Sequence, residues 1–139
     1  MQVRQALDED IGSGDITSQL IPEDRLACAY IISREQAILC GIPWAEACFS
    51  QIDARVQMNW LVREGQRLQA EQRVVEIHGP ARALLSAERS ALNFLQTLSA
   101  TATATWQFVQ QLEHSRTILL DTRKTLPGWR LAQKYATKL

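Results

Sequence analysis

Two adjacent cations stand in the part of the sequence whose residue types best suit binding chemistry. Arg123 and Lys124 lie between two threonines, Thr122 and Thr125, and a Pro-Gly turn follows them at residues 127–128. The preceding residues 117–120 are β-branched or leucine and predict a strand, and residues 129–139 predict a helix. Cations and hydroxyls at the end of a strand are suited to binding carboxylate or phosphate. A solvated loop with incidental charges is the alternative.

A second charged pair falls on a predicted helix over residues 81–99. Glu88 lies inside the apolar stripe of this helix, and Arg89 lies at its edge. A carboxylate on an apolar face is costly unless it is paired, so Glu88 predicts either an ion pair between elements or a functional role. The predicted stripe consists of Leu84, Leu85, Ala91, Leu92, Leu95 and Leu98.

The remaining pattern predicts the elements that would position these charges. Glycines 12 and 14 indicate a turn, because the further glycines of a phosphate-binding loop are absent. A proline at position 43 is typical of the first turn of a helix. The other expected elements are helices over residues 3–11, 42–51 and 101–112 and strands over residues 26–33, 36–40, 55–61 and 73–78.

Composition excludes several functional classes. Fifteen basic and fifteen acidic residues cancel, so no basic field indicates a nucleic-acid partner or an anionic membrane surface. No apolar run approaches the roughly 20 residues of a membrane span, and the N-terminus lacks a secretory signal. Cys28, Cys40 and Cys48 are irregularly spaced and lie in apolar contexts, which favours buried free thiols in a reducing cytoplasm over a zinc site.

The residues alone leave two classes of protein to compare. One is an enzyme that acts on a polyanionic small molecule and holds it with Arg89, Arg123 and Lys124. The other is a lipoyl- or biotin-carrier module, which residues 62–68 and 74–77 suggest by their strand-turn-strand pattern. A carrier needs an acylatable lysine at a hairpin tip. All three lysines lie at position 124 or later, outside the strand-rich region, so the carrier interpretation fails.

The order and spacing of several motifs resemble the quinolinate phosphoribosyltransferase family. The resemblance runs through nearly the whole chain, and its most specific parts are the segment Ala87-Glu88-Arg89 and residues 121–128. The other family-like stretches are residues 9–17, 41–43, 64–66, 84–86 and 92–95.

The resemblance implies an α+β protein. Residues 1–100 would form an N-terminal α/β sandwich, and residues 101–139 would begin an irregular α/β barrel that carries the active site. Residues 117–120 would be the first barrel strand, which places Thr122, Arg123 and Lys124 at its C-terminal end, where barrel enzymes carry their chemistry.

The reaction that the resemblance implies joins quinolinate to phosphoribosyl pyrophosphate and releases pyrophosphate and carbon dioxide, with Mg²⁺. By resemblance, Thr122, Arg123 and Lys124 bind substrate, and Arg89 reaches the quinolinate site of a neighbouring subunit. The expectation is a cytoplasmic homodimer or larger oligomer with shared sites and no membrane or nucleic-acid partner. The residue that performs the catalysis is not identified.

Three departures from the family pattern matter. Residues 99–103 lack the usual glycine, and Trp129 stands where leucine is usual. The family continues beyond Lys134-Tyr135-Ala136 to a histidine-arginine pair and to lysine and acidic residues for substrate and metal. This chain reaches Leu139 without them, so metal ligands are not expected here, and a barrel of on the order of 200 residues would be incomplete.

Alternatives of two kinds remain open. Within the superfamily, the chain is also compatible with nicotinate phosphoribosyltransferase or a related molybdenum-operon protein. Outside it, the chain would be a non-catalytic dimerisation fragment. His78 and His114 do not match the family histidine and are expected at the surface or at a strand end.

Overall fold

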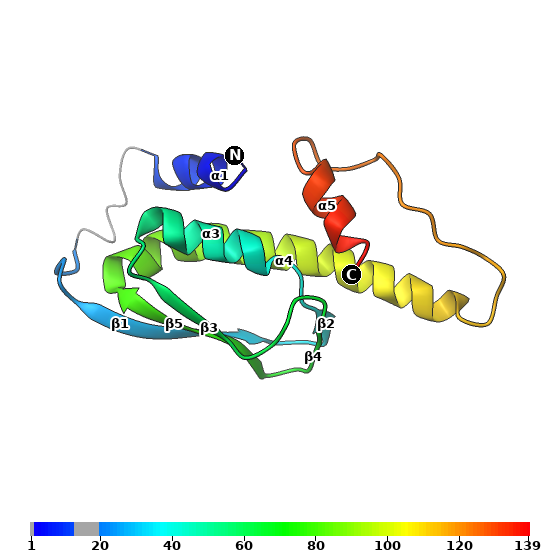
Figure 1. Cartoon of the computed structure of the whole chain (residues 1–139), viewed down its shortest axis with the longest axis horizontal. Coiled ribbons are helices and arrows are strands. Elements are labelled where there is room, and N and C mark those ends of the chain that lie inside the picture. The colour runs from blue at the N-terminus through cyan, green and yellow to red at the C-terminus, as the bar shows by residue number, and fades with distance from the viewer. Residues whose placement is uncertain (1, 13–19) are drawn as a thin grey trace.

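Helices and strands separate into layers around one long helix (Figure 1). The computed structural model describes residues 2–12 and 20–139. A sheet covers one side of the α3–α4 pair, and α1 and α5 lie on the other side (Figure 1). This mixture confirms the α+β class. The helices are α1 (Gln2–Ile11), α3 (Ile42–Ile52), α4 (Ala81–Leu112) and α5 (Arg130–Ala136), and the strands are β1 (Leu26–Ser33), β2 (Ala37–Ile38), β3 (Gln57–Trp60), β4 (Arg67–Leu68) and β5 (Gln72–Pro80).

Strand β5 lies at the centre of the main sheet, with β1 and β3 antiparallel on either side. Its residues Val75 and Ile77 are buried, whereas Tyr30 on the edge strand β1 points outward and is exposed. Between Val75 and His78, buried residues alternate with more exposed ones, which is the period of two of a half-buried strand. The shorter strands β2 and β4 pair separately. The main predicted strands are confirmed, and the strand expected over residues 36–40 is reduced to two residues.

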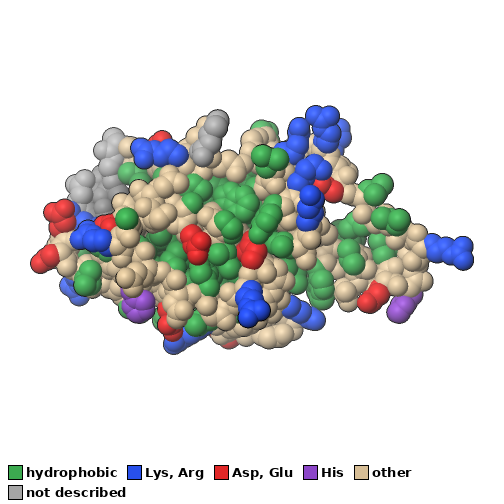
Figure 2. Space-filling view, in the orientation of Figure 1, with side chains coloured by type: hydrophobic (Ala, Val, Ile, Leu, Met, Phe, Trp, Pro, Cys, Tyr) green, Lys and Arg blue, Asp and Glu red, His purple; other side chains and the backbone are tan. Residues whose placement is uncertain are grey.

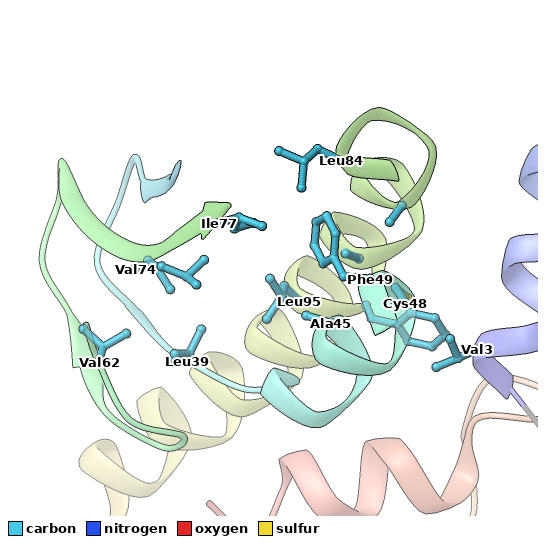
Figure 3. Packing of buried hydrophobic residues seen from close by; sticks show 14 of the residues in the cluster. Val3, Leu39, Ala45, Cys48, Phe49, Val62, Val74, Ile77, Leu84 and Leu95 are labelled. Atoms are coloured by element: carbon cyan, nitrogen blue, oxygen red, sulfur yellow. The ribbon is translucent and has the colours of Figure 1, made fainter. Parts of the chain in front are cut away.

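The hydrophobic core lies between the sheet and the α3–α4 pair. Phe49 of α3, Leu95 of α4 and Ile77 of β5 meet there, and Val3 of α1 packs at the opposite side of α3 (Figure 3). The core therefore fixes the sandwich as one packed body.

Helix α4 is one continuous helix over Ala81–Leu112, so the prediction of two helices is wrong. The Ala/Thr run at residues 100–105 contains no glycine or proline that would end a helix. Thr101 donates its hydroxyl hydrogen to the carbonyl of Thr97 at 3.0 Å, and Thr105 donates to that of Thr101 at 2.9 Å. These bonds satisfy the hydroxyls within the helix. Within residues 2–12 and 20–139, none of the helices has the length and apolar character needed to cross a membrane.

The buried stripe of α4 also differs from the predicted one. Leu85 is 41% exposed and Glu88 is exposed, whereas Ala87 and Ala91 are completely buried. Small residues can be buried where α1 and α3 approach closely, so the stripe follows size as well as hydrophobicity. The position inferred for Glu88 on an apolar face is therefore wrong, and its carboxylate has no burial cost to offset.

Residues 117–120 form no strand, which corrects a second prediction. Ile118 and Leu120 are 78% and 77% exposed. A strand is stabilised by hydrogen bonds to a neighbour. The described residues provide no partner strand for this segment. The helix predicted over residues 129–139 is confirmed in part, as α5.

The entry to α3 depends on Gly41 and Glu64. Gly41 has φ +115°, and a Cβ atom there would lie 3.4 Å from the Cα of Leu95 on α4. Glu64 Oε1 accepts a hydrogen bond from the Gly41 N–H at 2.8 Å, and its Oε2 accepts one from the Ile42 N–H at 3.0 Å. Glu64 also hydrogen-bonds the side chain of Tyr135 in α5. One carboxylate thus caps α3 and links it to α5.

The three cysteines occupy two kinds of environment. Cys40 and Cys48 are buried free thiols, as predicted, but Cys28 is exposed. The prediction fails at Cys28 because this residue points outward from the edge strand β1. Burial raises the pKa of Cys48 to about 11. Burial, with a further contribution from Glu64, raises the pKa of Cys40 to about 12. Of the predicted turn at residues 12–15, only Gly12 lies within the described residues.

We expect the free energy of unfolding to fall as the pH rises above about 9. The folded state keeps the protons of Cys40 and Cys48 up to pH values near 12 and 11, whereas the unfolded chain releases them near the ordinary pKa of 9.0. The contribution of each thiol to the free energy of unfolding is therefore fully present below about pH 9. Above that pH it falls by about 1.4 kcal/mol per pH unit. Urea unfolding followed by circular dichroism at several pH values between about 8 and 11 measures this slope.

The control compares two cysteine variants. Cys48→Ala should reduce the slope by about 1.4 kcal/mol per pH unit, and Cys28→Ala, at an exposed position, should leave it unchanged. A wild-type stability that stays constant between about pH 9 and 11 would contradict the prediction.

We also expect Glu64→Ala to lower the free energy of unfolding by about 1–3 kcal/mol, because the N–H groups of Gly41 and Ile42 lose their acceptor. Glu64→Gln keeps one acceptor oxygen and should lose less. Denaturant unfolding measures both variants, with the exposed Glu35→Ala as the control. Equal stability of the Glu64→Ala and Glu35→Ala proteins would refute the capping role.

Candidate functional site

The predicted cationic loop, residues 121–126, lies between α4 and α5 and is fastened to α5 at two points. Asp121 forms an ion pair with Lys134 at 2.5 Å, and the Leu126 N–H donates to Gln133 Oε1 at 2.8 Å. The hydrogen bond from Lys134 holds the pKa of Asp121 below its ordinary value, so this carboxylate stays charged. Helix α5 therefore positions the loop between these two contacts.

Within this loop, Thr122, Arg123 and Lys124 are all exposed. The backbone N–H of Lys124 donates to Thr122 Oγ1 at 3.1 Å, a local bond that turns the chain at the two cations. Residues 121–138 contain five Lys or Arg against one acidic residue. Figure 2 shows blue Lys and Arg side chains gathered over α5 and the loop beside it. This surface has the charge needed to attract an anion.

The end of the loop is held against the core by aromatic packing. Trp129 stacks on Phe94 of α4 with ring centroids 4.8 Å apart. Gln2 of α1 donates a side-chain hydrogen bond to the carbonyl of Gly128. Ala132 and Ala136 of α5 are buried in the same cluster as Leu98 of α4. The space that a tryptophan needs at position 129 is therefore present, and the rigid helices α4 and α5 support the cationic loop on both sides.

The fourth predicted residue, Arg89, lies elsewhere, at the contact between α1 and α4. Its Nη1 donates to Asp10 Oδ1 at 2.8 Å, and its side chain is 75% exposed. Helix α5 packs against Leu98 of α4. Arg89 lies about 13 Å from Leu98 along the helix axis, at 1.5 Å per residue. The structure thus brings Thr122, Arg123 and Lys124 together and places Arg89 at a different contact.

An open hollow of about 650 Å³ lies between α1, α4 and residues 127–129. Its ionisable lining residues are Glu9 and Asp10, which would repel a carboxylate or phosphate. Asn93 and Ser90 add neutral polar groups. The hollow is therefore less suited to an anion than the cationic loop.

The sequence did not predict the roles of three residues in these contacts. Lys134 and Asp121 were inside predicted segments, but nothing in their spacing indicated that they pair. Asp10 was inside a family-like stretch, and its partner is 79 residues away. Within the part of the chain that the structure describes, no group of three or more His, Cys, Asp or Glu side chains is arranged to hold a metal ion.

Two family models together match nearly the whole chain. The family model described as "Quinolinate phosphoribosyl transferase, N-terminal domain" matches residues 15–99, and the one described as "Quinolinate phosphoribosyl transferase, C-terminal domain" matches residues 101–139.

Individual relatives agree with this match. A "Probable nicotinate-nucleotide pyrophosphorylase [carboxylating]" of Bacillus subtilis is 41% identical over 94% of this chain and 45% of its own length. A "Quinolinate phosphoribosyltransferase [decarboxylating] 1b" of Nicotiana tabacum is 37% identical over 96% of this chain and 38% of its own length.

The solved nicotinate-nucleotide pyrophosphorylase of Francisella tularensis superposes with a TM-score of 0.94 and is 47% identical, covering 99% of this chain and 49% of its own. The chain therefore spans half or less of the length of these relatives. Both family models, the identities and the superposition agree, and the chain belongs to the quinolinate phosphoribosyltransferase family.

Proposed function

We propose that this chain forms part of an enzyme that converts quinolinate and phosphoribosyl pyrophosphate to nicotinate mononucleotide, pyrophosphate and carbon dioxide. The observation that carries the proposal is the exposed cationic loop with Thr122, Arg123 and Lys124, fastened to α5 by the Asp121–Lys134 ion pair. The names of the Bacillus and Nicotiana relatives support the same reaction.

The substrates carry several negative charges, and the cations of the chain match them by geometry. A guanidinium group pairs with a carboxylate through two parallel hydrogen bonds, which suits Arg89 and Arg123 to the two ring carboxylates of quinolinate. An ammonium group acts as a point charge, which suits Lys124 to a phosphate. The Thr122 hydroxyl can add a hydrogen bond to an anion beside Lys124.

The same cations would also stabilise the transition state. As the bond between ribose and pyrophosphate breaks, negative charge grows on the leaving group, and a nearby cation lowers its energy. After the ring nitrogen has attacked the ribose, loss of carbon dioxide leaves an electron pair on the ring carbon. Positive charge beside the ring would stabilise that electron pair as well.

The position of Arg89 supports a site shared between two copies of the protein. Arg89 is exposed at the α1–α4 contact, while the other three candidate residues lie beside α5. In a homodimer or larger oligomer, Arg89 of one copy would approach the cationic loop of another. We further propose that the boundary near residue 100 divides two domains and that the protein acts in the cytoplasm. The phosphoribosyl pyrophosphate would bring Mg²⁺ as its complex, held by groups beyond those described.

We expect Arg89→Ala to weaken quinolinate binding more than phosphoribosyl pyrophosphate binding. Losing one charge-assisted pair costs about 1.5–3 kcal/mol, or roughly ten- to a hundred-fold in affinity. The assay fuses residues 1–139 to the remaining half of the Francisella tularensis relative and measures the KM of each substrate. Arg4→Ala is the matched control, because Arg4 is also exposed and pairs with an aspartate. A quinolinate KM within about two-fold of wild type in an active fusion would remove Arg89 from the site.

We expect the 139-residue polypeptide alone to show no measurable phosphoribosyl transfer. The reaction needs both substrates held with the reacting atoms about 3–3.5 Å apart. The cationic loop is exposed, so water weakens each charge contact. Incubation with quinolinate, phosphoribosyl pyrophosphate and Mg²⁺, followed by measurement of released carbon dioxide, tests this. Turnover above about 0.01 s⁻¹, against about 1–10³ s⁻¹ for ordinary enzymes, would show that these 139 residues suffice.

A further inference from the structure

Asp10 carries a charge in a position where the local helix does not favour one. It lies in the last turn of α1, which ends at Ile11 and is followed by Gly12 with φ +52°. The C-terminal end of a helix dipole is negative and repels a carboxylate. Asp8 in the same turn has a local partner, Arg4, four residues earlier at 2.9 Å. Asp10 instead pairs across the structure with Arg89 on α4.

The two partners of this pair differ in exposure. The side chain of Asp10 is 21% exposed, while that of Arg89 is 75% exposed. Asp10 belongs to a helix whose Val3 and Leu7 are buried, and the Ser90 hydroxyl reaches the carbonyl of Ala6 at 3.5 Å. The carboxylate is thus anchored by packing of α1 on α4, and the guanidinium extends from it toward solvent.

We propose that Asp10 is a positioning residue that holds the Arg89 guanidinium in the orientation that binds a ring carboxylate of quinolinate. This inference rests on the function proposed above. An exposed arginine has many rotamers, and a ligand must otherwise restrict them when it binds. The bond to Asp10 at 2.8 Å restricts them in advance. Asp10 takes up only part of the donor set of a guanidinium, which has five N–H groups.

Asp10 also has an opposing effect on anion binding. Its negative charge reduces the attraction of Arg89 for an anion. Removing this charge therefore strengthens that attraction, but it also frees the Arg89 side chain to adopt other rotamers. If Asp10 positions Arg89, its removal lowers the affinity for quinolinate. If Asp10 only offsets the positive charge of Arg89, its removal raises that affinity.

The experiment titrates quinolinate into the ¹⁵N-labelled 139-residue chain and follows the Nε–Hε resonance of Arg89. We expect Asp10→Ala to weaken quinolinate binding by about three- to ten-fold and Asp10→Asn, which keeps an acceptor oxygen, to restore part of it. Asp8→Ala removes the same charge from the same helical turn and should leave the affinity within about two-fold. Pyrophosphate binding, read from the amide resonances of Arg123 and Lys124, should be the same in all variants.

The free protein provides a second readout. In the absence of ligand, Asp10→Ala should average the χ1 couplings of Arg89, and Asp8→Ala should leave them unchanged. Unaltered Arg89 couplings, or an Asp10→Ala protein that binds quinolinate as well as or better than wild type, would overturn the positioning role. Thermal unfolding of each variant separates a local effect from loss of the fold.

A double variant distinguishes this inference from the proposed function. If Asp10 acts through Arg89, Asp10→Ala combined with Arg89→Ala should bind quinolinate no more weakly than Arg89→Ala alone. Additive losses would overturn the positioning role while leaving Arg89 in the site. If Arg89→Ala has no effect on quinolinate binding, the binding role proposed for Arg89 fails instead. If the wild-type chain does not bind quinolinate, the cations described here do not form a quinolinate site by themselves, and the binding roles proposed for them fail.

Discussion

Close approach along helix α4 is the constraint on which the other elements depend. Ala87 and Ala91 are completely buried and Ala102 nearly so, which allows the neighbouring backbones to come near. Gly41 belongs to the same constraint, since a Cβ atom there would lie 3.4 Å from the carbonyl oxygen of Phe94. Larger side chains at these positions would push the neighbouring elements off α4, because packed interiors tolerate little added volume. The packing of the core, the start of α3 and the position of α5 all depend on this face of α4.

The candidate site is built at the edge of that surface and not within it. The core supplies rigid helices, and the loop between α4 and α5 supplies exposed cations that the Asp121–Lys134 pair keeps in place. Arg89 follows the same arrangement, because its backbone is part of α4 while its guanidinium is at the surface. Charged binding groups need solvent access to their ligands, so they lie on a scaffold that they contribute little to stabilising.

The sequence predicted the local elements better than their partners. Strand β1 has the predicted bounds, because alternation and β-branched residues act over a few neighbours. The family resemblance predicted binding roles for Thr122, Arg123 and Lys124, and these roles stay predictions. Two predictions failed and one contact was missed, because each depends on distant parts of the chain. Residues 117–120 have β-forming residues but no strand beside them, Glu88 lies on a face set by helix packing, and Asp10 pairs with a residue 79 positions away.

The continuity of α4 has a mechanical consequence. The two family models meet at residue 100, and α4 runs through that point without interruption from Ala81 to Leu112. At 1.5 Å per residue the helix is about 48 Å long, and its hydrogen-bonded backbone resists bending. A continuous helix therefore joins the two matched regions rigidly, and their junction does not act as a hinge.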